Sequence, residues 1–134
     1  MELNTPKTQI KKKAILLVDD DMVLLDIGEK MLKRLDYDVF TASGCNEAVS
    51  ITKNHSERIF CAIIDLTMPD IDGIETFKRV KKIKPDIRVI LSSGYLEDQI
   101  QEKISETKPD EFIQKPFQLK ELLSKLQKIN SIPS

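Results

Sequence analysis

Residues 14–18, Ala14-Ile-Leu-Leu-Val18, form an unbroken apolar run that ends directly at Asp19-Asp20-Asp21. Because apolar and polar residues do not alternate in this run, it is typical of a strand buried on both faces of a sheet. Phe60-Cys-Ala-Ile-Ile64 and Val89-Ile-Leu91 repeat the pattern farther along the chain. We therefore expect three central strands at these positions.

Two weaker, more polar runs have the character of edge strands, namely Asp38-Val-Phe-Thr-Ala42 and Glu111-Phe-Ile-Gln114. Apolar residues recur at helical spacing between the strands, over residues 24–35, 74–80, 96–104 and 119–126. Residues 44–54 are predicted to be helical mainly because they lie between two strands. Five alternating strand–helix units indicate an α/β fold with a doubly wound parallel sheet, helices on both faces and right-handed crossovers.

The length of 134 residues allows one domain, which we place at residues 14–129 between a polar tail at 1–13 and a short tail at 130–134. The chain has 21 Lys and Arg against 22 Asp and Glu, without the basic excess of a nucleic-acid or membrane-surface binder. Two cysteines are too few for a disulfide framework, and apolar runs of about five residues cannot span a membrane. With no signal-peptide pattern, these features favour a cytoplasmic protein.

Chemically reactive side chains follow four of the five predicted strands. Asp19-Asp20-Asp21 follows the first strand, Asp65 ends the third, Ser92-Ser93-Gly94 ends the fourth, and Lys115-Pro116 follows the fifth. In an open α/β sheet, ligands bind outside the carboxyl ends of the strands, where the strand order reverses. Taken singly, Asp20 or Asp21 is equally well explained as the N-cap of the helix that begins near Met22.

The group as a whole points to phosphate chemistry. Two carboxylates about 5 Å apart repel by roughly 3 kcal/mol at an effective dielectric constant of about 20, so such a cluster calls for a cation. Carboxylate oxygens suit Mg²⁺, which keeps waters and accepts phosphate oxygens as ligands. Lys115 and Ser93 would supply a positive charge and a hydroxyl donor for a phosphoryl group. Asp65 is the natural nucleophile, since an aspartate can form an acyl phosphate.

With these residues in view, the sequence resembles the receiver domain of two-component response regulators over about residues 14–129. The resemblance is carried by four segments: Ile15-Leu-Leu-Val-Asp-Asp20, Ile64-Asp-Leu-Thr-Met-Pro-Asp-Ile-Asp-Gly73, Ile90-Leu-Ser-Ser-Gly94 and Gln114-Lys-Pro-Phe117. It implies a flavodoxin-like doubly wound five-stranded parallel sheet, (βα)5, with strand order 2-1-3-4-5. The switch point of that order lies between the first and third strands, where the acidic residues were placed above.

The resemblance also implies a role for each acidic-site residue. Asp65 would accept the phosphoryl group from a phosphohistidine, in a reaction that depends on Mg²⁺. Asp20 would bind the metal directly, Asp19 largely through water, and Thr67 through its backbone carbonyl.

Three further positions match residues that bind the phosphoryl group or report its presence. Lys115 would bind phosphoryl oxygens, Ser93 would move to hydrogen-bond them, and Phe112 occupies the position of a switch aromatic. Ser93 stands where Thr is commoner, and Phe112 stands where Tyr is frequent. Thr107-Lys-Pro-Asp110 lacks the Gly-Ala turn of many relatives, which puts the fourth helix in doubt. Gly73 is expected to supply a backbone conformation that other residues disfavour.

The implied function is a regulatory phosphoacceptor rather than an enzyme. Its partners would be a histidine kinase or histidine phosphotransfer protein and a downstream protein or attached domain, with no direct contact to nucleic acid or membrane. The protein would be a monomer, or a weak dimer through the face formed by the fourth helix, fifth strand and fifth helix. A stand-alone regulator and a receiver cut from a hybrid sensor kinase both remain open.

Two other functions can be compared with this one. A Mg²⁺-dependent phosphatase of the haloacid-dehalogenase type would also use Asp65 as nucleophile, but it requires a second Asp where this chain has Thr67. A flavin carrier on the same fold would need a Ser/Thr/Gly-rich phosphate loop after the first strand, where this chain has three acids.

Overall fold

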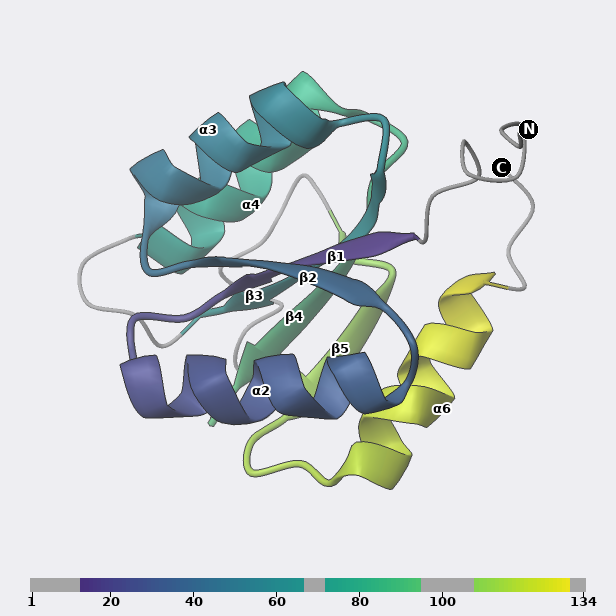
Figure 1. Cartoon of the computed structure of the whole chain (residues 1–134). Helices are drawn as coiled ribbons and strands as arrows, with labels where there is room; N and C mark the ends of the chain where they lie inside the picture. The colour runs from purple at the N-terminus through teal and green to yellow at the C-terminus, as the bar shows by residue number, and fades with distance from the viewer. Residues whose placement is uncertain (1–12, 67–71, 95–107, 131–134) are drawn as a thin grey trace, which may run out of the picture.

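The computed structural model describes residues 13–66, 72–94 and 108–130, which include one five-stranded parallel sheet (Figure 1). The strand order is β2-β1-β3-β4-β5, so the predicted 2-1-3-4-5 order is confirmed. The strands are β1 (Ala14–Val18), β2 (Asp38–Ala42), β3 (Ile59–Asp65), β4 (Arg88–Ser93) and β5 (Glu111–Gln114).

Helices cover both faces of the sheet, as a doubly wound fold requires. α3 and α4 lie on one face, and α2 and α6 on the other (Figure 1). Their bounds are α2 Met22–Arg34, α3 Cys45–His55, α4 Asp72–Ile83 and α6 Leu119–Asn130. The predicted helix over 96–104 lies outside the described residues. No helix in the described part of the chain is long and apolar enough to cross a membrane.

Each face of the sheet has its own hydrophobic core, and β1 contributes to both. Leu16 packs on the same side as Phe77 of α4, whereas Ile15 and Leu17 pack on the side of Leu122 of α6. All five residues of β1 are buried, which explains why its sequence shows no polar alternation. Because β1 is buried on both faces, the position of Asp19 at the carboxyl edge of the sheet is fixed.

The strand register brings the chemically reactive residues to one edge. Val18 of β1 pairs with Ile64 of β3, one residue before Asp65, and Asp65 pairs with Ser92 of β4. Ser93 pairs with Gln114 of β5, the residue before Lys115. The carboxyl ends of β1, β3, β4 and β5 are thus in line.

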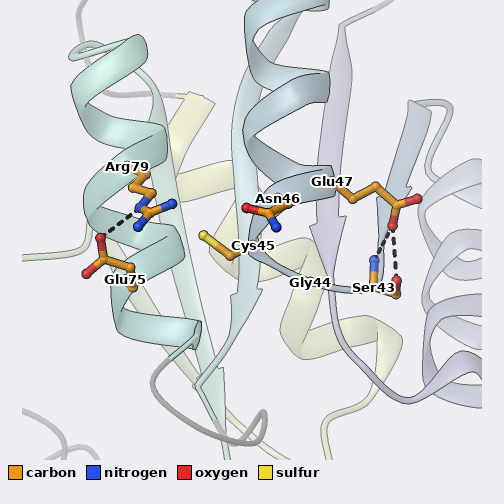
Figure 2. Close-up of a pocket in the computed structure, with 7 residues that line it drawn as sticks. All are labelled: Ser43, Gly44, Cys45, Asn46, Glu47, Glu75 and Arg79. Carbon is orange, nitrogen blue, oxygen red and sulfur yellow. Dashed lines mark hydrogen bonds and ion pairs between the residues drawn. The ribbon is translucent and has the colours of Figure 1, made fainter.

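Helix α3 begins without a hydrogen bond from an N-cap side chain. The N-cap residue is Gly44, which has no side-chain hydrogen bond. Glu47 instead folds back, and its Oε1 accepts hydrogen bonds from the Ser43 N–H at 2.6 Å and the Ser43 hydroxyl at 3.1 Å (Figure 2). A polar cavity of about 480 Å³ lies at this helix end (Figure 2). Its lining includes Cys45 of α3, which is half-buried, and Arg79 of α4, which is exposed.

Gly73 is required for space and not for an unusual backbone conformation. A Cβ atom at this position would lie 2.6 Å from the carbonyl oxygen of Asp65 and 2.6 Å from Cα of Leu66. None of the described glycines has a positive φ, so the conformational role expected from the sequence is wrong. The missing side chain lets the first turn of α4 pack directly on the backbone that carries Asp65.

We expect Gly73→Ala to destabilise the protein by about 1–3 kcal/mol, because the added methyl group overpacks against backbone that cannot move aside easily. Gly94→Ala is the matched control, since a Cβ there meets nothing within 4 Å. Urea unfolding monitored by circular dichroism measures both. Equal stability of Gly73→Ala and Gly94→Ala would contradict the close-approach explanation.

Candidate functional site

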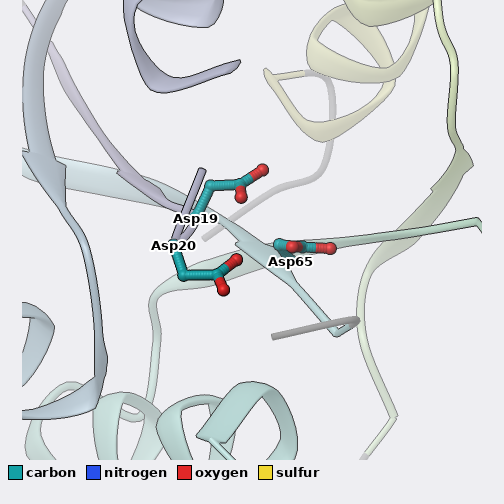
Figure 3. Close-up of side chains that lie close together, drawn as sticks. All are labelled: Asp19, Asp20 and Asp65. Atoms are coloured by element: carbon teal, nitrogen blue, oxygen red, sulfur yellow. The ribbon is translucent and has the colours of Figure 1, made fainter. Parts of the chain in front are cut away.

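Three carboxylates from two neighbouring strands converge at the carboxyl edge of the sheet (Figure 3). Asp19 and Asp20 follow β1, and Asp65 is the last residue of β3. One oxygen from each carboxylate lies within 4.8 Å of the others. Asp19 and Asp65 are 5% and 2% exposed, whereas Asp20 is exposed to solvent. The structure therefore brings together the three acids that the strand ends predicted.

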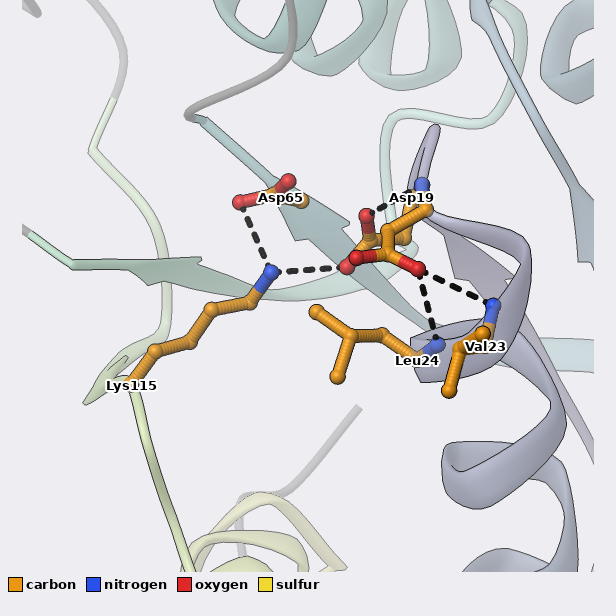
Figure 4. A network of polar contacts seen from close by, with 6 residues as sticks. Asp19, Val23, Leu24, Asp65 and Lys115 are labelled. Atoms are coloured by element: carbon orange, nitrogen blue, oxygen red, sulfur yellow. Dashed lines mark hydrogen bonds and ion pairs between the residues drawn. The ribbon is translucent and has the colours of Figure 1, made fainter.

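Lys115 bridges two of these acids (Figure 4). Its Nζ lies 2.7 Å from Oδ2 of Asp19 and 3.3 Å from Oδ1 of Asp65. The backbone N–H of Lys115 donates to the carbonyl oxygen of Ser93 at 2.7 Å, which continues the β4–β5 pairing beyond the strand. From that anchor the side chain extends to the end of β3, although β4 separates β5 from β3 in the sheet.

Burial and neighbouring charge shift the pKa of both members of the Asp19–Lys115 pair. Burial raises the pKa of the Asp19 carboxyl and the charge of Asp65 adds to that rise, while hydrogen bonds from Lys115 and the Asp21 N–H only partly oppose it. Burial lowers the pKa of Lys115, but the hydrogen bond to Asp19 and the charge of Asp65 outweigh it, so the net shift is upward. Asp19 and Asp65 therefore keep Lys115 protonated, and its single positive charge does not neutralise both of them.

Asp21 is the N-cap of α2, which settles the choice that the sequence left between Asp20 and Asp21. Its Oδ1 accepts hydrogen bonds from the backbone N–H groups of Val23 at 3.0 Å and Leu24 at 3.3 Å. Asp20 instead belongs to the acidic cluster. Three successive acids thus have different tasks, which their spacing alone does not reveal.

Of the other residues predicted for the site, the structure describes Ser93 and Phe112. Ser93 is fully buried at the end of β4. Phe112 of β5 is partly buried and packs against the core on the side of α3 and α4. Thr67 lies outside the described residues, as does the predicted helix over 96–104, which would form the switch surface together with β5 and α6.

The ligand atoms of the acidic cluster are of the kind that bind a divalent cation. Its three carboxylates carry three negative charges, and Lys115 offsets one of them. Hard oxygen donors with an exposed member, Asp20, suit a cation that keeps several waters, as Mg²⁺ does. In the part of the chain that the structure describes, this is the one group of three such ligands that lie close enough together to share an ion.

An apolar surface on α2 adjoins the acidic cluster. Met22 and Val23 are each 66% exposed and Ile27 is 47% exposed. Beside them a cavity of about 350 Å³ lies between α2 and the segment after β5, and both Asp19 and Lys115 form part of its wall.

Comparison with known proteins identifies the fold and the family. The family model described as "Response regulator receiver domain" matches residues 15–127. A receiver domain structure from Methanospirillum hungatei, described as CheY-like, superimposes with a TM-score of 0.80 at 28% identity, covering 90% of this chain and 95% of that one. The predicted flavodoxin-like fold is thereby confirmed.

Two of the curated relatives are much longer proteins. The sensor kinase CckA of Brucella abortus is 30% identical over 86% of this chain and 12% of its own length. The transcriptional regulator NtrC of Azospirillum brasilense is 32% identical over 85% of this chain and 23% of its own length. The chain thus spans less than a quarter of either relative.

These matches support the receiver hypothesis and give no support to the haloacid-dehalogenase alternative. The family match extends from the second residue of β1 into α6 and therefore includes Lys115 and every residue of the acidic cluster. Sequence, strand order and site geometry agree on one conclusion. The chain belongs to the response regulator receiver domain family.

Proposed function

We propose that Asp65 accepts a phosphoryl group from a phosphohistidine and that the resulting charge changes what this domain binds. The observation that carries the proposal is the Lys115 ammonium 3.3 Å from Asp65 and 2.7 Å from Asp19, with Asp20 completing the cluster. A structural salt bridge alone would need one acid. Three acids and one lysine leave an excess of negative charge, which a divalent cation would offset so that an anionic phosphoryl group could bind there.

In the transfer, a carboxylate oxygen of Asp65 attacks phosphorus. A P–O bond forms, the P–N bond to the donor imidazole breaks, and its electron pair stays on the imidazole nitrogen. Lys115 would follow the oxygens of the incoming group, because its ammonium already contacts the acceptor carboxylate. The Ser93 hydroxyl would move to donate a hydrogen bond to the same group. The Phe112 ring, as the switch, would then turn in response to the movement of Ser93.

A Mg²⁺ ion would be held by Asp19, Asp20 and Asp65, with the carbonyl of Thr67 as a further ligand. When bound, it supplies positive charge that offsets the phosphoryl oxygens and the carboxylates. Asp19 would contribute orientation more than direct contact, since both of its oxygens already accept hydrogen bonds from this chain.

The apolar surface of α2 supports a protein as the phosphoryl donor. Met22, Val23 and Ile27 are exposed next to the site, as a docking surface for a histidine kinase or phosphotransfer protein would be. A downstream protein or an attached domain would then read the phosphorylated state. We propose that the domain works in the cytoplasm, as a monomer or weak dimer, and regulates rather than catalyses, without binding nucleic acid itself.

Acetyl phosphate with Mg²⁺ should add one phosphoryl group to the wild-type protein, and Asp65→Asn should abolish the addition because an amide is a poor nucleophile. Intact-mass spectrometry measures the product. Asp26→Asn, which removes an exposed carboxylate of α2, is the control and should react as the wild type does. Full labelling of Asp65→Asn would place the acceptor elsewhere.

Millimolar Mg²⁺ should stabilise the wild-type fold, by about 2.7 kcal/mol at one hundred times its dissociation constant. Asp20→Asn should lose that gain, yet without metal it should be at least as stable as the wild type because a repulsion is relieved. Thermal unfolding with Mg²⁺ and with a chelator gives both values. An unchanged wild-type melting temperature would argue against the metal site.

A further inference from the structure

We propose that Asp21 is a positioning residue for the transfer site, because its capping of α2 fixes the backbone N–H that orients Asp19. This inference rests on the function proposed above. Asp21 lies outside the acidic cluster and is exposed, so its side chain does not act on the phosphoryl group itself. Its effect on the site passes through its own peptide group.

Asp21 is fixed in place by several hydrogen bonds to the first turn of α2. Its side chain accepts from the N–H groups of Val23 and Leu24, and its carbonyl oxygen accepts the first helical hydrogen bond, from Leu25 at 2.9 Å. The backbone at Asp21 is extended, with φ −89° and ψ 109°, as an N-cap residue requires. The direction of the Asp21 N–H is therefore set by the helix cap.

That N–H is aimed at the acidic cluster. It donates to Oδ1 of Asp19 at 2.9 Å, which leaves Oδ2 of the same carboxylate to accept from Lys115 at 2.7 Å. Both oxygens of this nearly buried side chain are thus committed, so the carboxylate cannot rotate without losing a contact. Lys115 in turn reaches Asp65, and the cap of α2 is connected to the acceptor by three successive contacts.

Loss of the Asp21 cap should lower the Mg²⁺ affinity of the site while the protein remains folded. Without the side-chain oxygen, the first turn of α2 frays and the Asp21 N–H is no longer held toward Asp19. Partners that orient metal ligands typically contribute tenfold or more to metal affinity. We therefore expect about a tenfold loss of Mg²⁺ affinity, with a slower reaction of Asp65 toward acetyl phosphate.

Two variants separate the cap from the charge. Asp21→Asn removes the negative charge but keeps a side-chain oxygen that caps as well as aspartate does. Asp21→Ala removes both. Any difference between them reports the cap, since their charge is the same. Glu121→Ala is the matched control, because it also removes one negative charge and one hydrogen bond at a helix start, here from the Gln118 N–H at 3.4 Å before α6.

Titration calorimetry with MgCl₂ measures the affinity, and hydrogen exchange of the Asp21 amide reports its contact with Asp19. We expect Asp21→Ala to bind Mg²⁺ about tenfold more weakly than Asp21→Asn and to exchange that amide faster. Glu121→Ala should match the wild type in both measurements. Circular dichroism confirms that each variant is folded.

Equal Mg²⁺ affinity of Asp21→Ala and Asp21→Asn, in a wild type that binds the metal and reacts at Asp65, would overturn the positioning role alone. An equal loss in Glu121→Ala would also overturn it, because the effect would then be general loosening of a helix end. If the wild type neither bound Mg²⁺ nor reacted, the proposed function itself would fail, and the two failures are thus distinct.

Discussion

Three carboxylates within 4.8 Å of one another, with one lysine between two of them, impose the constraint around which the carboxyl edge of this sheet is organised. At an effective dielectric constant of about 20, each pair of like charges at such distances costs roughly 3–4 kcal/mol. The fold tolerates this cost because Lys115 offsets one charge and Asp20 remains open to water. A cation would relieve the remaining repulsion, and a phosphoryl group would bring further oxygens for Lys115 and for that cation to bind.

Local structure keeps these charges in place. The buried run of β1 fixes Asp19, the close packing of Gly73 on the backbone at Asp65 fixes the acceptor strand end, and the continued β4–β5 pairing anchors Lys115. The cap at Asp21 adds a hydrogen bond to the second oxygen of Asp19. Each contact is ordinary by itself, but together they hold like charges close to one another before any ligand binds.

The residue pattern was enough to predict the strands and the meeting of the three acids, because unbroken apolar runs locate buried strands and parallel strands end at one edge. The strand order was implied by the resemblance to receiver domains. It did not show which acid caps α2, since Asp20 and Asp21 are equally suitable in type and position. It also misled about Gly73, because a glycine used for close packing looks the same in sequence as one used for its backbone conformation. Such distinctions depend on how the side chains and backbone are oriented, which residue type and spacing do not show: Asp21 accepts from Val23 and Leu24, and Gly73 lies against the backbone of Asp65.

We propose that Lys115 and a divalent cation compete for the net negative charge of the three acids. The most direct test is the Mg²⁺ affinity and metal-free stability of Lys115→Met, with the exposed Lys120→Met as control. Removing one partner of a buried polar contact costs about 1–3 kcal/mol, so Lys115→Met should be less stable without metal. It should also bind Mg²⁺ several-fold more tightly, because a neighbouring positive charge is gone. Unchanged stability together with equal or weaker Mg²⁺ binding would contradict the account.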